Sequence, residues 1–150
     1  MAALCQRFPD SYWRELDAKN DYPQDCVKAL SHGGYLAALI PTEYGGSDSS
    51  LLQAPVILEE IHHSGGNAAA CHGQMYAMGI LLRHGSTEQK RRYLTAIASG
   101  SLRLQSFAVT EPAAGSDTAS RSTTTTRDCS AYLVTGQKIW TRLGSSTLTS

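Results

Sequence analysis

The sequence predicts an α+β fold, with an all-α domain over residues 1–100 followed by the start of an antiparallel β domain over residues 101–150. Two observations predict this class. Up to Gly100, apolar residues recur at helical spacing between Gly and Pro breaks. Beyond Gly100 the period becomes two, and a stretch of Ser and Thr at 120–126 favours an edge or solvent-facing strand. The predicted boundary between the domains therefore lies near Gly100.

Two short helices are expected first. Tyr12, Trp13 and Leu16 recur on one face, which indicates a helix within residues 8–20. A second helix opens around Tyr22-Pro23-Gln24-Asp25 and ends before Gly33-Gly34. The short apolar run 35–40 stops at Pro41, and the Gly/Ser cluster that follows it predicts a loop.

Three longer helices follow. The first, over 50–63, is expected to place Glu59 and Glu60 outward and most of its apolar residues on one side, namely Leu51, Leu52, Pro55, Val56, Leu58 and Ile61. The second, over 67–84, is rich in small residues, which indicates either close packing against a neighbouring helix or the lining of a ligand channel. The third runs from Thr87 to about Ser99, and Ser86 with Gln89 has the form of a capping box at its start.

The β region is expected to hold short strands. Residues 102–109 alternate as in a half-buried strand, and residues 120–126 form a second strand. Residues 127–130 are a turn candidate, and residues 132–135 and 138–141 are expected to form a further pair around Thr135-Gly136.

Composition excludes several function classes. Thirteen basic and 13 acidic side chains give a formal net charge of zero, which disfavours general binding to nucleic acid. No apolar run approaches the roughly 20 residues of a membrane span, and the N-terminus does not resemble a secretory signal. The four cysteines are scattered, as is usual in a reducing compartment, so the cytoplasm is expected, or the mitochondrial matrix if a leader was removed. His62-His63 and Cys71-His72 lack metal-ligand spacing, so no metal site is predicted.

The segment 107–117 is the strongest candidate site. It is a strand that ends in a hydroxyl residue and turns through Pro, Gly, Ser and Asp, which can gather backbone N–H groups as phosphate-binding nests do. Thr110 and Ser116 add neutral hydroxyls, and Trp140 could supply a flat wall for a ring system. On composition alone, an ordinary turn between strands and a core tryptophan explain the same residues.

Four motifs in order resemble the acyl-CoA dehydrogenase family of flavoproteins. Residues 109–117, VTEPAAGSD, resemble its VTEP-x-AGSD signature, and residues 136–141, GQKIWT, resemble its NGxK-x-W segment downstream. Upstream, residues 39–46 are similar to the family's P-x-x-YGG turn, and residues 83–94 to its xGxxEQKxxYL helix start. The resemblance covers about residues 4–140.

This resemblance implies a chemistry. Members use FAD to introduce a double bond between the α and β carbons of a fatty acyl-CoA thioester, and electrons usually leave to an electron-transfer flavoprotein. By the resemblance, Thr110 would hydrogen-bond the flavin ring, and Gly115 and Ser116 would meet the FAD phosphates and the substrate thioester region. Carried over in the same way, the residues lining or covering the flavin ring are Phe107, Val109, Thr110, Trp140 and Thr141.

The resemblance also sets limits. The family's catalytic glutamate lies in a C-terminal helical domain, which is expected to be absent here, and no glutamate of this chain matches it. The likeness fades from Arg142 onward. The alternatives are a non-catalytic fragment or interaction module without turnover, and an acyl-CoA oxidase-type relative. Members assemble as homo-oligomers largely through the C-terminal helices, so the oligomeric state of this chain stays open.

Overall fold

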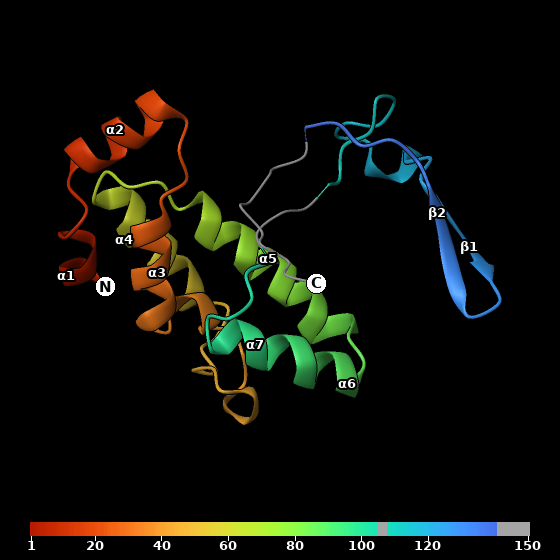
Figure 1. The fold of residues 1–150 in the computed structure, drawn as a ribbon, viewed down its shortest axis with the longest axis horizontal. Coiled ribbons are helices and arrows are strands. Elements are labelled where there is room, and N and C mark those ends of the chain that lie inside the picture. The colour runs from red at the N-terminus through yellow and green to blue at the C-terminus, as the bar shows by residue number, and fades with distance from the viewer. Residues whose placement is uncertain (105–107, 141–150) are drawn as a thin grey trace. The chain divides into compact units, whose positions relative to one another are not determined.

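The computed structural model describes residues 1–104 and 108–140 (Figure 1). Contacts within the chain group these residues into a helical unit, 1–104, and a β unit, 108–140. Residues 101–104 thus group with the helices, while the domain boundary near Gly100 stays a prediction. Within the described ranges, no helix has the length and apolar character needed to cross a bilayer.

The helical unit begins with five α-helices; the first was not predicted, and the other four agree with the expected positions to within a few residues. They are α1 (Ala2–Cys5), α2 (Asp10–Lys19), α3 (Gln24–His32), α4 (Ala54–His63) and α5 (Ala69–His84). Between α3 and α4 the chain makes two 3-10 turns, Tyr35–Ala37 and Thr42–Tyr44. The second turn ends at Gly45, whose φ of 89° is left-handed backbone that favours glycine.

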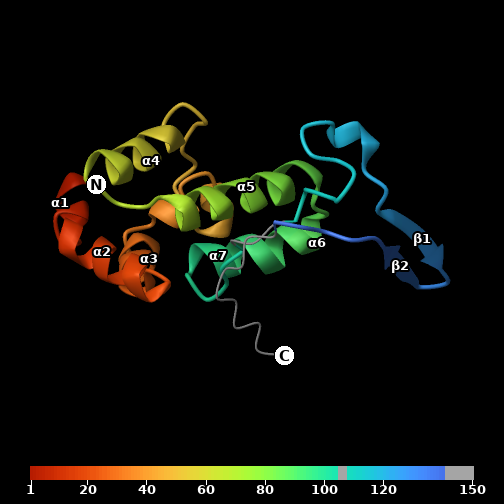
Figure 2. The ribbon, with the colours of Figure 1, turned by 90° about the horizontal axis from the view of Figure 1, so that it is seen from above.

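The last helical stretch runs through α6 (Thr87–Gln89), a π-helical turn (Lys90–Leu94) and α7 (Thr95–Ala98). The capping box is confirmed, because the Gln89 N–H donates to Ser86 Oγ at 3.2 Å and the Ser86 N–H donates to Gln89 Oε1 at 2.9 Å. The stretch ends at Gly100, which has a φ of 76°. Both ribbon views place it beside α5 (Figure 1, Figure 2).

A single apolar core holds the helical unit together. Its most buried large side chains come from the loop after α3 and from α4, α5, the π-helical turn and α7; they are Leu36, Ile40, Ile61, Met78, Leu94 and Ile97. Leu102 and Leu104 pack against the same core from the chain that leaves α7. Burial of such side chains is the main favourable term in folding.

One apolar face was predicted wrongly. Leu51 and Leu52 precede α4 in a turn and are 75% and 87% exposed, and Val56 is 57% exposed. The helix begins only at Ala54, so Leu51 and Leu52 are not part of its core-facing stripe. Ile61 is a buried residue of α4 in the apolar core, and the half-buried Leu58 packs against this core.

The β unit contains one antiparallel hairpin, β1 (Thr124–Asp128) and β2 (Ala131–Thr135). The register pairs Thr124 with Thr135 and Asp128 with Ala131, so Cys129 and Ser130 form a two-residue turn. Cys129 has a φ of 51°, as such tight hairpins require. The predicted turn is thus confirmed at Cys129 and Ser130, whereas Arg127 and Asp128, which were predicted as part of it, belong to β1.

Two predicted strands are not found among the described residues. Residues 102–104 and 108–109 have no ladder partner, since Leu102 and Leu104 pack on helices instead. Residues 138–140 form no strand either, and β2 pairs with β1 rather than with them. The segment is tied back by one backbone hydrogen bond, in which the Ile139 N–H donates to the Thr110 carbonyl at 3.0 Å.

Candidate functional site

The candidate site is built on a tight turn in the segment 109–117. The Glu111 N–H donates to the Ala114 carbonyl at 3.2 Å, and the Ala114 N–H donates back to the Glu111 carbonyl at 3.1 Å. Pro112 sits at the second position of this turn, where its restricted φ is favourable. The turn therefore directs Gly115 and Ser116 away from it, and both are exposed.

The Glu111 carboxylate is the most densely bonded group of the β unit. The residue is 2% exposed. Its Oε2 accepts from the Ser122 N–H at 2.6 Å and Ser122 Oγ at 2.9 Å. Its Oε1 accepts from the Thr123 N–H at 3.2 Å, Thr123 Oγ1 at 2.5 Å and Lys138 Nζ at 2.7 Å. Five donors thus converge on one carboxylate.

These contacts set the charge state of Glu111. The ammonium of Lys138, followed by the hydroxyl of Thr123 and the N–H of Ser122, holds the pKa of Glu111 well below its ordinary value. The carboxyl is therefore ionised throughout the neutral range. A group held so firmly as an anion is suited to a structural ion pair and not to accepting a proton from substrate.

Gly136 allows this cluster to close. A Cβ at that position would lie 2.2 Å from Thr123 Oγ1, closer than real Cβ atoms approach other heavy atoms. Only glycine lets the chain after β2 pass so near Thr123. Two residues later, Lys138 reaches the carboxylate.

The sequence-predicted cofactor residues fall into three groups. Val109 and Thr110 are half-buried just before the turn, and Gly115 and Ser116 are exposed beyond it. Trp140 is 87% exposed, next to the Ile139 whose N–H bonds to Thr110. Phe107 and Thr141, also predicted, lie outside the described residues.

A second candidate feature lies on α5. The small-residue face there is largely buried, and Gln74 within it is 1% exposed. The Gln74 Nε2 donates to the Leu36 carbonyl at 3.4 Å, while Oε1 has no hydrogen-bond partner in the part of the chain that the structure describes. Helix packing explains most of this face, and the amide oxygen is available to a further donor.

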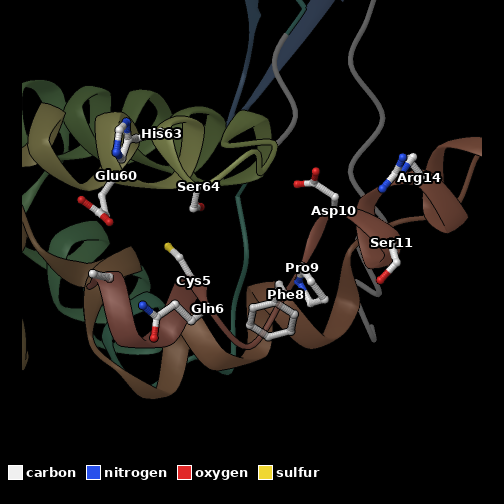
Figure 3. Close-up of a pocket in the computed structure, with 11 residues that line it drawn as sticks. Cys5, Gln6, Phe8, Pro9, Asp10, Ser11, Arg14, Glu60, His63 and Ser64 are labelled. Atoms are coloured by element: carbon white, nitrogen blue, oxygen red, sulfur yellow. The ribbon is translucent and has the colours of Figure 1, made fainter.

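An open cavity of about 760 Å³ lies between α1, the start of α2 and the end of α4 (Figure 3). Its polar lining is of mixed charge, from Asp10, Arg14, Glu60 and His63. Figure 3 shows the side chains of Glu60 and Cys5 directed into the space between these helices. The lining of this cavity contains none of the predicted cofactor residues. Among the described residues, no three His, Cys, Asp or Glu side chains lie close enough to hold a metal ion.

Comparison with known proteins identifies the family. Residues 1–101 match the family model described as acyl-CoA dehydrogenase, N-terminal domain. The chain belongs to the acyl-CoA dehydrogenase family. It is 36% identical over 132 residues to cyclohex-1-ene-1-carbonyl-CoA dehydrogenase of Geobacter metallireducens, which covers 87% of this chain and 35% of that protein. It is 32% identical over 148 residues to the probable acyl-CoA dehydrogenase FadE25 of Mycobacterium tuberculosis, covering 97% of this chain and 38% of that one.

Solved structures agree with the family. The acyl-CoA dehydrogenase of Geobacillus kaustophilus superposes with a TM-score of 0.81 at 25% identity, over 93% of this chain and 37% of that one. A structure described as an electron transferring flavoprotein of Acidaminococcus fermentans matches with a TM-score of 0.80 at 25% identity, over 93% and 37%. The Bacillus anthracis acyl-CoA dehydrogenase, solved with FAD, matches with a TM-score of 0.58 at 28% identity, over 78% and 21%.

This acyl-CoA dehydrogenase relative spans 35% to 38% of the length of the curated relatives named above. The predicted fold, a helical domain followed by antiparallel β structure, is confirmed. A Cβ at Gly115 would meet no heavy atom within 4 Å, so the space beside this exposed residue is open among the described residues.

Sequence reasoning missed the role of two residues. Glu111 was assigned only to the turn, and Lys138 only to a strand beside Trp140. The available signal was a carboxylate directly after the half-buried Val109 and Thr110, since such a group needs a cation or several donors when buried. Nothing in the spacing indicated that Lys138, 27 residues later, would supply the cation.

Proposed function

We propose that this chain supplies the helical domain and the flavin-facing β segments of an FAD-dependent oxidoreductase acting on fatty acyl-CoA thioesters. The observation that carries the proposal is the pairing of its two signature segments. The backbone bond from Ile139 to Thr110 and the ion pair from Lys138 to Glu111 join residues 109–117 to residues 136–140. Residues expected from the family to face one flavin are thereby joined within a single unit.

The residues have separate proposed roles toward the cofactor. Thr110 donates its hydroxyl to the flavin ring, with its backbone fixed by the bond to Ile139. Gly115 offers open backbone, and the exposed Ser116 offers a hydroxyl, to phosphate oxygens and to the thioester end of the substrate. Val109 and Trp140 line the ring, together with Phe107 and Thr141.

When bound, FAD accepts the hydride that leaves the β carbon of the acyl chain. A set of neutral donors near the ring favours this chemistry, because the reduced ring gains negative charge that such donors stabilise. No residue of these 150 is proposed as the catalytic base, since Glu111 is already committed to five donors.

The substrate and partners are proposed at the level of their class. The substrate is an acyl-CoA, and the small-residue face of α5 is proposed to border its acyl chain. Electrons pass to an electron-transfer flavoprotein, and homo-oligomeric assembly is expected in the complete enzyme. The compartment, cytoplasm or mitochondrial matrix, stays a prediction.

Flavin retention tests the proposal. The purified chain is mixed with FAD and passed through gel filtration, and its visible absorption spectrum is recorded. We expect a weakly retained band that is shifted from that of free FAD, and no turnover of acyl-CoA. The variant Thr110→Val should lose the band, whereas Thr126→Val, at an exposed position of β1, should keep it. Equal retention by both variants would contradict the role of Thr110.

Reaction of the complete enzyme with oxygen as sole acceptor would instead assign it to the oxidase-type relatives. A colourless chain would mean that residues 1–150 do not form a flavin site by themselves.

A further inference from the structure

Two residues of the β unit bracket the hydrogen bond that joins the flavin-facing segments. Glu111 directly follows Thr110, and Lys138 directly precedes Ile139. The backbone bond between Thr110 and Ile139 therefore lies one residue from each end of the ion pair. Lys138 Nζ also lies 3.5 Å from the Val109 carbonyl, so one ammonium contacts both sides of the Thr110 position.

The surroundings of the carboxylate favour an anion. Each of its five partners is an N–H, a hydroxyl or an ammonium that donates to it. An amide in place of the carboxylate would direct its NH₂ group either at the Ser122 N–H or at the Thr123 N–H and the Lys138 ammonium. Neither backbone N–H can turn away, so a buried donor would be left unpaired.

The ion pair itself is largely removed from water. The side chains of Glu111 and Lys138 are 1% and 27% exposed. Removing one partner of such a pair leaves the other charge uncompensated, and the segment that carries it is then free to move toward solvent. The loss of Lys138 would release residues 136–140 from the turn, and Trp140 with them.

We propose that the Glu111–Lys138 ion pair is a positioning element, which holds the hydroxyl of Thr110 and the ring of Trp140 at the spacing that one flavin ring requires. This inference rests on the proposed function. In this proposal, neither Glu111 nor Lys138 contacts the cofactor. Each acts through the backbone of its neighbour, Glu111 through Thr110 and Lys138 through Ile139.

The test compares four variants with two matched controls. The variants are Glu111→Gln, Lys138→Met, the double variant, and Lys138→Arg, which keeps the charge. The controls are Glu59→Gln and Lys28→Met, which make the same changes at exposed positions of the helical unit. Two quantities are measured on the 150-residue chain: the Kd for FAD from flavin fluorescence, and amide hydrogen exchange of Ile139 without FAD.

We expect each single neutralising variant to weaken FAD binding and to accelerate Ile139 exchange, both by about tenfold. The double variant should be no weaker than the weaker single variant, because both changes break one unit. Lys138→Arg should restore most of the affinity, which a general loss of folding would not allow. The controls should match the unaltered chain, and circular dichroism should show unchanged helix content throughout.

Three results separate this inference from the proposed function. Unchanged FAD binding and unchanged exchange in Glu111→Gln would overturn the inference and leave the proposed function standing. Additive losses in the double variant would also overturn it, since independent residues lose affinity independently. If the unaltered chain takes up no FAD, the proposed function of this chain fails. Exchange at Ile139 then tests whether the ion pair holds the bond between Ile139 and Thr110: acceleration supports that part of the inference, and no change refutes it.

Discussion

Replacing Leu94 tests the helical core most directly. Leu94 lies in the π-helical turn between α6 and α7 and is 0% exposed. Leu94→Ala removes buried methyl groups and leaves a cavity that the surrounding core fills only in part. Such changes cost about 2–5 kcal/mol, and we expect about 3 kcal/mol here. For a unit of this size, that lowers the Tm by at least about 10 °C. Urea unfolding followed by far-UV circular dichroism measures the loss, and an unchanged m-value shows that the unfolded state is the same.

Leu52→Ala is the matched control. The chemical change is identical, but Leu52 is 87% exposed in the turn before α4. We expect its free energy of unfolding to change by less than about 0.5 kcal/mol. Equal losses in the two variants would refute the reasoning, because Leu52 would then pack in the core as its sequence pattern indicated.

Three further predictions follow from single sites. Gly79→Ala should raise the free energy of unfolding by roughly 0.5–1 kcal/mol, since a Cβ there meets nothing within 4 Å. Gly46→Ala should lower the free energy of unfolding, because its Cβ would lie 2.1 Å from the Ile40 carbonyl oxygen. Urea unfolding checks both. The folded pKa of Glu111 lies below the unfolded value, so its contribution to stability is present above about pH 4.3 and is lost as the pH falls toward the folded pKa. NMR titration of its carboxyl carbon should show protonation only well below that pH, and an ordinary midpoint would contradict the five-donor cluster. Of the four thiols, only the exposed Cys129 should react rapidly with a disulfide reagent in the native chain, since the other three are buried. Burial also raises the pKa of Cys71 to about 12. Rapid reaction of more than one thiol per chain would show that the core is open to the reagent.

Much of the helical unit follows from local chemistry. The capping box at Ser86 and the left-handed turn at Gly100 each depend on a few adjacent residues, so their sequence signals are strong. The hairpin turn at Cys129 and Ser130 is equally local. The start of the helix at Ser86 and its end at Gly100 agree with expectation because capping and turn formation need no distant partner.

The errors occurred where a distant partner decides the outcome. Alternation over residues 102–109 indicated a strand, yet Leu102 and Leu104 found apolar partners among the helices. An alternating pattern reports which residues seek burial and not what buries them. For the same reason, apolar character could not show that Leu51 and Leu52 would remain exposed.

The sequence by itself determined the helical class of residues 1–100, the order of the family's motifs and the residue types expected near a flavin. Only the tertiary structure decided that Glu111 is buried and paired with Lys138, and that this pair adjoins the bond between Thr110 and Ile139. The physical reason is the range of the interactions. Caps and turns are formed by neighbours along the chain, whereas a buried carboxylate is ionised only where folding brings donors and a cation from separate segments to the same point.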